Sequence, residues 1–204
     1  MDDKLYAQFS ITYQEEKLVR KKRVGEWIKN SLLPLQSSND RQSLNLEIGC
    51  GHGHWLSSFA SEVQDEIFIG IDLINKRIRK AVSKCEKRKQ NNILFYKAEA
   101  CEFLEFCDLS LSNTFVMYPD PWPKSRHHKR RLIQRSFLTL LAAKTEPSGV
   151  LYFMTDYFPY IEWSKQIITE SKLWELTNLP WPHNATSYFS ELLPENNFLC
   201  AKRL

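Results

Sequence analysis

Short apolar runs alternate with amphipathic segments along most of the chain. Five runs have the length and apolar content of buried strands, and they span 44–48, 67–71, 93–96, 114–118 and 150–154. Segments with helical spacing of apolar residues follow them and span 55–61, 75–88, 101–107, 130–144 and 160–171. Strands that alternate with helices indicate a parallel sheet with helices on both faces. The pattern therefore predicts an α/β fold with a doubly wound, mostly parallel sheet.

The two ends of the chain depart from this alternation. Residues 13–33 predict a helix and 34–43, PLQSSNDRQS, predict a polar linker. We therefore expect 1–43 to be an N-terminal helical appendage and 44–204 to be the main domain. In the tail, weaker strand patterns at 174–177 and 198–202 flank a stiff, proline-rich loop at 180–186. We expect this tail to add an antiparallel strand at one edge of the sheet.

Apolar positions within two helices carry sharper expectations. In the N-terminal helix one face can be shared by Val19, Val24, Trp27 and Ile28, with the basic cluster on the other face. In the helix at 75–88 the lysines and arginines should face outward, and the buried stripe should consist of Ile74, Ile78, Ala81, Val82 and Cys85.

The chain is mildly basic, and its charge is unevenly distributed. A length of 204 residues with 43% hydrophobic content fits one sizeable globular domain. The net charge is +4 and the pI about 8.7. Basic residues gather at 17–23, 76–89 and 124–131, and together they predict a positive face suited to a polyanion. Solvated helix faces are the alternative for any single cluster.

Five cysteines, an odd number without a Cys-x-x-Cys pair, disfavour a disulfide scaffold and a structural zinc site. A reducing, cytoplasmic location is expected. The sequence shows neither an apolar signal core nor a run long enough to span a membrane, so no membrane association is expected. His52, His54, His127 and His128 have no acid or cysteine at ligand spacing, so no metal site is predicted.

Candidate chemistry falls at the end of every predicted parallel strand. In doubly wound sheets, ligands bind beyond the carboxyl ends of the strands. The residues at these ends are the glycine-rich segment Gly49–Gly53, Asp72, Glu99, Asp120 and Asp156. We therefore expect an active site along that edge of the sheet.

The segment LEIGCGHG at 46–53 places an acid before three alternate glycines, directly after a strand. Such glycines allow a tight turn and close approach of a ligand. A dinucleotide needs Gly-x-Gly-x-x-Gly, but here the third glycine comes one residue early and His54 stands where Gly or Ala is expected. S-adenosylmethionine carries an ammonium, a sulfonium and a ribose diol, so it needs carboxylates and carbonyls instead.

Three acids and the glycines are the candidate cofactor-binding residues. Gly49 and Gly51 lie where the donor would approach the backbone, and Glu47 suits its cationic end. Asp72 is placed to accept hydrogen bonds from both ribose hydroxyls, and Glu99 to lie near the adenine or the ribose. A plain turn, with Asp72 as a helix cap, is the alternative.

The stretch FVMYPDPWPKSRHHKRRL at 115–132 begins as a strand and then places three prolines around one acid and one indole. Tyr118, Asp120 and Trp122 each precede a proline, so we expect a stiff, extended loop. Such a loop is suited to holding one acid against a substrate. The basic run that follows, Lys124 and Arg126–Arg131, suits phosphates. A proline-rich turn before a solvated basic helix is the alternative.

These segments resemble the tRNA (guanine-N7-)-methyltransferase family. The resemblance rests on Leu46–Gly53, Gly70–Asp72, Thr155-Asp156 and, above all, YPDPWPK at 118–124 with RHHKRR at 126–131, and it covers residues 44–172. It implies a Rossmann-like class I methyltransferase domain with S-adenosylmethionine as donor. It also implies tRNA as the partner, with the guanosine at position 46 of the variable loop as acceptor.

The resemblance further implies positions for individual residues. The donor site would be lined by Glu47, Asp72, Glu99 and Asp120, and the substrate would contact Lys124 and Asp156. Near its C-terminus the family has a Thr-x-aromatic-Glu segment that joins the substrate site. Here that segment is Thr186, Ser187, Tyr188 and Phe189, so Phe189 replaces the acid and Glu191 lies two residues on.

The chemistry of guanine supports one catalytic acid. N7 carries a free lone pair at neutral pH, so its methylation needs no strong base. A preorganised carboxylate would stabilise the positive charge passing to the purine and accept the guanine N–H groups. We expect Asp120 to be this catalytic residue and Lys124 and Arg126 to contact phosphates. Trp122 or Tyr118 would stack on the unstacked base, with packing beneath the loop as the alternative for Trp122.

Three other functions fit parts of the sequence. They are a nucleic-acid methyltransferase acting on an exocyclic amine, a non-catalytic RNA-binding module on a methyltransferase fold, and a nicotinamide dehydrogenase. The basic run after Trp122 disfavours the first, and the intact acids Glu47, Asp72 and Asp120 disfavour the second. The sequence does not decide between a monomer and a homodimer.

Overall fold

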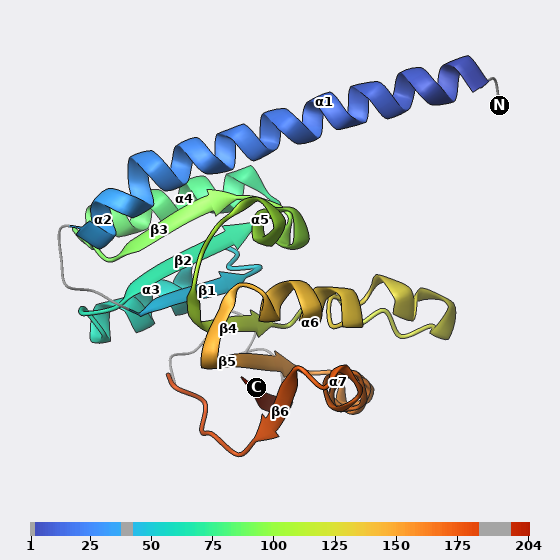
Figure 1. Ribbon diagram of the computed structural model, residues 1–204. Coiled ribbons are helices and arrows are strands. Elements are labelled where there is room, and N and C mark those ends of the chain that lie inside the picture. The colour runs from blue at the N-terminus through green and yellow to red at the C-terminus, as the bar shows by residue number, and fades with distance from the viewer. Residues whose placement is uncertain (1–2, 38–42, 184–196) are drawn as a thin grey trace.

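A seven-stranded sheet forms the centre of the molecule (Figure 1). The computed structural model describes residues 3–37, 43–183 and 197–204, with side chains described from residue 12 onward. The strands are β1 (Leu44–Ile48), β2 (Ile67–Asp72), β3 (Ile93–Lys97), β4 (Leu111–Met117), β5 (Thr145–Thr155), β6 (Trp174–Thr177) and β7 (Asn197–Arg203). They lie in the order β3-β2-β1-β4-β5-β7-β6.

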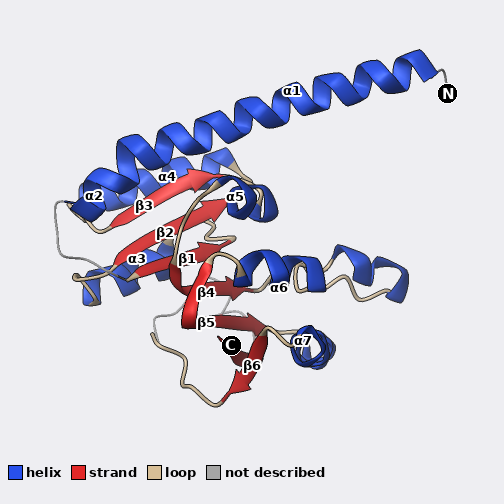
Figure 2. Ribbon diagram, viewed as in Figure 1, coloured by secondary structure: helices blue, strands red, loops and turns tan. Residues whose placement is uncertain are grey.

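The first five strands run parallel and the tail reverses direction. Parallel pairing joins β3 to β2, β2 to β1, β1 to β4 and β4 to β5. β7 is antiparallel to both of its neighbours, β5 and β6, so the chain ends one strand inside the edge. The arrowheads of β1, β2 and β3 therefore point to the same side in Figure 2. This confirms the predicted doubly wound, mostly parallel sheet with an antiparallel tail.

Helices cover both faces of the sheet. They are α3 (His54–Glu62), α4 (Asn75–Lys87), α5 (Ala100–Phe106), α6 (Arg135–Ala142) and α7 (Phe158–Ser171). On one face Phe103, Leu138 and Ile168 from α5, α6 and α7 share a core. On the other face Leu56 of α3 and Ala81 of α4 pack into a second core. Because both faces are covered, β1 and β2 are buried at every position, as parallel strands usually are.

The N-terminal helices add to the first of these cores. α1 (Asp3–Trp27) continues into a π-helical turn, η1 (Ile28–Leu32), and α2 (Leu33–Ser37), and its N-terminal half projects beyond the sheet in Figure 1. Val24 and Leu32 are buried there, and Trp27 packs on Tyr96 with 4.9 Å between ring centroids. Val19 is 49% exposed, so it is not buried as Val24 is. The division of the chain at residue 43 stays a prediction.

Basic residues of α1 dock this helix onto α5. Arg20 donates two 2.9 Å hydrogen bonds to the carboxylate of Glu102, and Lys17 donates one of 2.9 Å to Glu105. Two members of the predicted basic cluster at 17–23 are thus engaged within the protein. α1 has 25 residues, yet no helix in the described part of the chain is long and apolar enough to cross a membrane.

Two predicted element boundaries and one predicted burial are wrong. The linker does not begin at residue 34, because the chain stays helical to Ser37. The helix expected from residue 130 begins at Arg135, since the preceding Gln134 is extended and donates to the carbonyl of His128 at 2.7 Å. Ile74 is 45% exposed because it precedes α4 in an extended conformation and so lies off the helical face.

The tail packs against the core that lies beneath α3 and α4. Trp181 packs against Trp55, Phe115 and Tyr152, with ring centroids 5.7–6.3 Å away. The indole N–H of Trp55 donates to the carbonyl of His183 at 3.2 Å. The predicted proline-rich loop therefore completes the second core, as far as residue 183.

We predict that Leu32→Ala lowers the free energy of unfolding by about 2–5 kcal/mol, because it leaves a cavity in the main core. Leu32 has no exposed surface, whereas its neighbour Leu33 is 49% exposed. Leu33→Ala is thus the matched control and should change stability by less than about 0.5 kcal/mol. Urea unfolding followed by circular dichroism measures both, and equal losses would contradict the packing described here.

Candidate active site

The carboxyl ends of β1–β5 bring the candidate residues to one edge of the sheet. β1 ends at Ile48 before the glycine turn, and β2 ends at Asp72 itself. Glu99, Asp120 and Asp156 follow β3, β4 and β5 by one to three residues. Parallel pairing of the five strands makes this a single edge, as expected for a ligand site in this fold.

The glycine turn after β1 is built from left-handed residues. Gly49, Gly51 and Gly53 have φ of 80°, 56° and 64°, a region that glycine enters without strain. The amides of Gly49 and Cys50 both donate to the carbonyl of Ile71, at 2.8 and 3.0 Å. These bonds hold the turn against the end of β2.

The glycines of this edge have different surroundings. A Cβ on Gly49 or Gly51 would meet no other atom within 4 Å. A Cβ on Gly53 or Gly70 would lie 2.6 Å from the ring of Phe95. Gly53 and Gly70 are therefore required for packing, whereas Gly49 and Gly51 border open space in which a ligand can approach the backbone.

Asp72 links the glycine turn to α4. One carboxylate oxygen accepts from the amide of Gly51 at 3.0 Å and the other from the amide of Ile74 at 2.7 Å. The guanidinium of Arg77 lies 3.4 Å from the first oxygen. Asp72 thus holds the turn and the residue before α4, but it is not the helix cap considered as the alternative, because the N-cap of α4 is Ile74 and no side chain caps that helix.

Glu47 is the unusual acid of the site. It is the penultimate residue of β1, is 4% exposed, and its Oε2 accepts no hydrogen bond from any described residue. Burial, and to a lesser extent the nearby charge of Asp72, raises the pKa of Glu47 to about 8. A buried acceptor without a donor is costly unless a ligand supplies one. Glu47 is therefore fitted to receive a cationic or N–H-bearing group.

Glu99 is exposed at the N-terminus of α5. Its side chain accepts from the amide of Glu102 at 2.8 Å, which makes it the N-cap of that helix. The cap fixes the direction of the side chain at the edge of the sheet. Its predicted contact with the donor stays a prediction.

The proline-rich loop after β4 is not extended as predicted. Tyr118 and Trp122 have φ of 49° and 43°, so both lie in the left-handed region although each precedes a proline. Such residues cost of order 1–3 kcal/mol each and persist only where surrounding contacts fix them. The amide of Tyr118 donates to the carbonyl of Met154 on β5 at 2.9 Å. The loop is rigid because of contacts outside it, in addition to its prolines.

Asp120 stands exposed between these two strained residues. Among the described residues its carboxylate forms no ion pair and no hydrogen bond. Its charge contributes to a raised pKa of the buried Tyr160 hydroxyl, about 12, whose main cause is burial. The catalytic assignment of Asp120 stays a prediction, and the geometry leaves the carboxylate free for a ligand.

The basic run after the loop divides into two groups. Lys124, Arg126 and Lys129 are exposed on or next to η2 (Ser125–Arg130), a 3-10 helix. Arg130 stacks on Trp122, with 5.0 Å from guanidinium carbon to ring centroid. Arg131 is only 3% exposed, so the prediction that it contacts phosphate is wrong. Trp122 contacts His127 and Arg130 of η2, and its stacking on the base stays a prediction.

The remaining predicted substrate residues divide between the described and undescribed parts of the chain. Asp156 is exposed directly after β5, and α7 has Tyr157 at its N-cap position, so Asp156 does not cap that helix. The turn there is made by Thr155, whose hydroxyl accepts from the amide of Tyr157 at 3.2 Å. Thr186, Ser187, Tyr188 and Phe189, with Glu191, lie outside the described residues.

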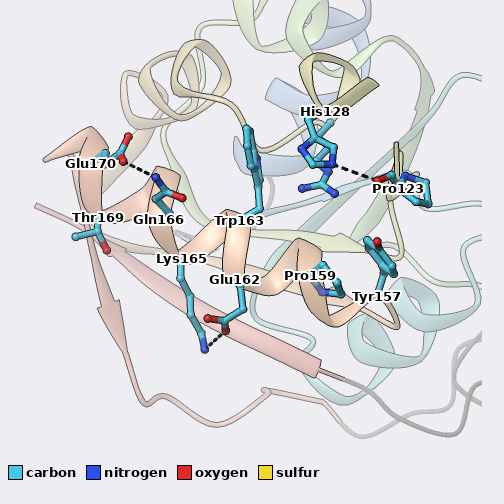
Figure 3. Close-up of a pocket in the computed structure, with 11 residues that line it drawn as sticks. Pro123, His128, Tyr157, Pro159, Glu162, Trp163, Lys165, Gln166, Thr169 and Glu170 are labelled. Carbon is cyan, nitrogen blue, oxygen red and sulfur yellow. Dashed lines mark hydrogen bonds and ion pairs between the residues drawn. The ribbon is translucent and has the colours of Figure 1, made fainter. Parts of the chain in front are cut away.

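A groove of about 660 Å³ lies beside the loop, between η2 and the outer surface of α7 (Figure 3). Pro123 and His128 line one side, and Tyr157, Trp163 and Gln166 are among the residues on the other. None of the glycine-turn residues lines it. Because Glu47 and Asp72 are also absent from it, we place the candidate cofactor site at the glycine turn and not in this groove.

Sequence reasoning missed the residues that fix the loop. Tyr160 and Trp163 of α7 hold the guanidinium of Arg131, at 4.8 and 5.2 Å from their ring centroids. Nothing local in the sequence relates positions 131 and 160. Lys84 was likewise counted only as part of a basic face, but its ammonium donates to the carbonyl of His52 at 2.9 Å. No cluster of potential metal ligands occurs among the described residues.

Solved structures agree with this architecture. An antibiotic-related methyltransferase aligns with a TM-score of 0.61 at 17% identity, covering 86% of this chain and 94% of that one. The aminoglycoside resistance methyltransferase NpmB1 aligns with a TM-score of 0.60 at 16% identity, covering 85% and 92%. At such identity the likeness shows the fold, which is that of class I methyltransferases.

The family follows from the sequence comparison. The family model described as "Putative methyltransferase" matches residues 41–197, and the chain belongs to this family. The tRNA (guanine-N(7)-)-methyltransferase of Corynebacterium efficiens is 35% identical over 139 residues, which are 67% of this chain and 55% of that protein. The protein of the same name from Idiomarina loihiensis is 35% identical over 159 residues, 76% and 64%. The chain thus spans about half to two thirds of the length of these relatives.

We predict that Gly53→Ala destabilises the fold more than Gly51→Ala does. Both substitutions place alanine at positive φ, which costs about 1–2 kcal/mol. Only Gly53→Ala also forces a methyl group against Phe95, which adds about 1–3 kcal/mol. Thermal and urea unfolding of the two variants provide the comparison. Equal stabilities would mean that Gly53 is not a packing glycine.

Proposed function

We propose that this protein transfers a methyl group from S-adenosylmethionine to N7 of a guanosine in tRNA, at position 46 of the variable loop. The observation that carries the proposal is the presence of two acids with different surroundings at one edge of a methyltransferase fold. Glu47 is buried with an unsatisfied oxygen, and Asp120 is exposed with no partner among the described residues. The first suits the donor and the second suits the acceptor.

The residues at the glycine turn fit the proposed donor. S-adenosylmethionine would supply an electrophilic methyl group on its sulfonium. The free oxygen of Glu47 would accept from the donor's ammonium, which restores the hydrogen bond that the buried acid lacks. Gly49 and Gly51 leave space for close approach to the backbone. Asp72 would present its carboxylate to the ribose, and the capping Glu99 would lie beyond β3 on the same edge.

Asp120 is placed to act on the acceptor base. It follows β4, which is the neighbour of β1, so the acid and the glycine turn share the centre of the sheet edge. Its carboxylate would accept the N–H groups of guanine and stabilise the positive charge that develops on the ring. Adenine has no N–H at N1, so the same acid would favour guanine.

The charge distribution and the relatives support tRNA as the substrate. Lys124, Arg126 and Lys129 form an exposed basic surface directly after the Asp120 loop. Phosphate contacts of this kind position a nucleic acid without reading its sequence. Two relatives 35% identical to this chain are named tRNA (guanine-N(7)-)-methyltransferase. We further propose that Asp156 and the segment 186–189 contact the same substrate.

The direct test is methyl transfer from labelled S-adenosylmethionine to bulk tRNA, followed by nucleoside analysis. We expect 7-methylguanosine as the labelled product, located in the variable loop by nuclease mapping. A label found only in N6-methyladenosine or N2-methylguanosine would overturn the proposal in favour of an exocyclic-amine methyltransferase. Binding of tRNA without any transfer would favour a non-catalytic module.

We predict that Asp120→Asn reduces kcat by at least about 100-fold, because the amide removes the charge that stabilises the developing cation. Binding of S-adenosylmethionine, measured by calorimetry, should change little. Asp108→Asn is the matched control, since Asp108 is an exposed acid outside the site. Full activity of Asp120→Asn would remove Asp120 from the mechanism.

We predict that donor binding releases a proton from Glu47. With its pKa raised to about 8, Glu47 is mostly protonated at neutral pH in the free protein. An ammonium group beside it favours the carboxylate, so affinity should rise with pH between about 6 and 7.5. Calorimetry in buffers of different ionisation enthalpy measures the released proton. Glu47→Gln should bind more weakly and without this release; proton release that persists in the variant would assign it to another group.

A further inference from the structure

Arg131 has the surroundings of a structural residue, although it ends a basic run. It is 3% exposed, and its Nε donates to the carbonyl of Pro121 at 2.9 Å. Its guanidinium lies on the rings of Tyr160 and Trp163, at 4.8 and 5.2 Å from their centroids. The planar guanidinium suits this arrangement, because it stacks on rings while it donates in its own plane.

The two rings that hold Arg131 are themselves fixed. The hydroxyl of Tyr160 accepts from the amide of Ile133 at 3.2 Å, and the indole N–H of Trp163 donates to the carbonyl of the same residue at 3.2 Å. Tyr160 has no exposed surface. Arg131 therefore connects the loop to a rigid part of α7, whose Trp163 lies beside His128 in Figure 3.

The carbonyl that Arg131 holds belongs to the peptide group that joins Pro121 to Trp122. Trp122 has a φ of 43°. A residue before a proline does not adopt this conformation without outside support. Fixing the peptide plane of Pro121 therefore fixes the backbone on the C-terminal side of Asp120, the residue immediately before Pro121.

We propose that Arg131 is a positioning residue for the methyl-transfer reaction, which holds the Asp120 loop in its strained conformation through the Pro121 carbonyl. The inference rests on the proposed function for the consequence in catalysis. The basic run then has two separate tasks. Lys124, Arg126 and Lys129 face solvent and contact phosphate, whereas Arg131 faces inward and orders the acid.

The first test separates positioning from phosphate binding. In Arg131→Met, kcat should fall about 100-fold, the loss that a 1 Å misplacement of a reacting group produces. The slope of log Kd for tRNA against log salt concentration should stay at the wild-type value. In the control Arg126→Met that slope should decrease by about one, as for a lost phosphate contact. A reduced slope in Arg131→Met would overturn the proposal, because it would make Arg131 a phosphate ligand.

A conservative variant and a folding control accompany this test. Arg131→Lys keeps the charge, but its ammonium lacks the plane needed to stack and donate together, so its kcat should lie between those of wild type and Arg131→Met. Both variants should bind S-adenosylmethionine with wild-type affinity, which shows that the sheet edge is folded. An unchanged kcat in both variants would overturn the proposal.

The second test does not need activity. Proteins labelled with 5-fluorotryptophan report each indole by 19F NMR, and Trp122→Phe and Trp27→Phe assign two of the signals. In Arg131→Met the Trp122 signal should shift or broaden, whereas the Trp27 signal, from the α1 contact with Tyr96, should stay. An unmoved Trp122 signal would refute the proposal that Arg131 holds the loop, even if the enzyme proves active. If wild-type protein methylates no guanosine, the proposed function fails, while this test of the contact between Arg131 and the loop still applies.

Discussion

The carboxylate of Asp72 is the contact on which the candidate site depends. It accepts amide donors from the turn after β1 and from the start of α4, so one side chain sets the relative position of two strand ends and a helix. Glu47, on the adjacent strand, is the opposite case, because it is buried with an oxygen that no described donor reaches. This difference between a satisfied and an unsatisfied acid distinguishes the residue that builds the site from the residue that is fitted to a ligand.

Rigidity on the acceptor side has a different origin. The loop after β4 carries two residues at positive φ before prolines, a conformation that prolines alone do not favour. Contacts from three directions keep it in place: the carbonyl of Met154 on β5, the guanidinium of Arg131, and Arg130 on Trp122. The strain is concentrated on both sides of Asp120. Strained backbone of this kind is typical of functional sites, where it holds a reacting group ready.

Several basic residues form contacts within the protein and are therefore less available to a polyanion. Arg20 and Lys17 fasten α1 to α5, and Lys84 supports the glycine turn through the carbonyl of His52. Arg77 forms an ion pair with Asp72, and Arg131 donates a hydrogen bond to the Pro121 carbonyl of the proline-rich loop. The count of lysines and arginines therefore overstates the surface available to a nucleic acid. The basic residues that remain exposed directly after the Asp120 loop are Lys124, Arg126 and Lys129.

The sequence by itself determined the strand and helix order, the parallel sheet, the antiparallel tail and the edge on which the acids gather. These follow from local periodicity and from the geometry of parallel strands, which needs no knowledge of distant contacts. It did not determine the conformation of the proline loop or the burial of Leu32. Only the tertiary structure decided which member of a basic run turns inward, because Arg131 meets Tyr160 and the Pro121 carbonyl through packing between segments remote in the chain. A residue's type limits what it can bind, but the partner that folding brings to it selects what it does.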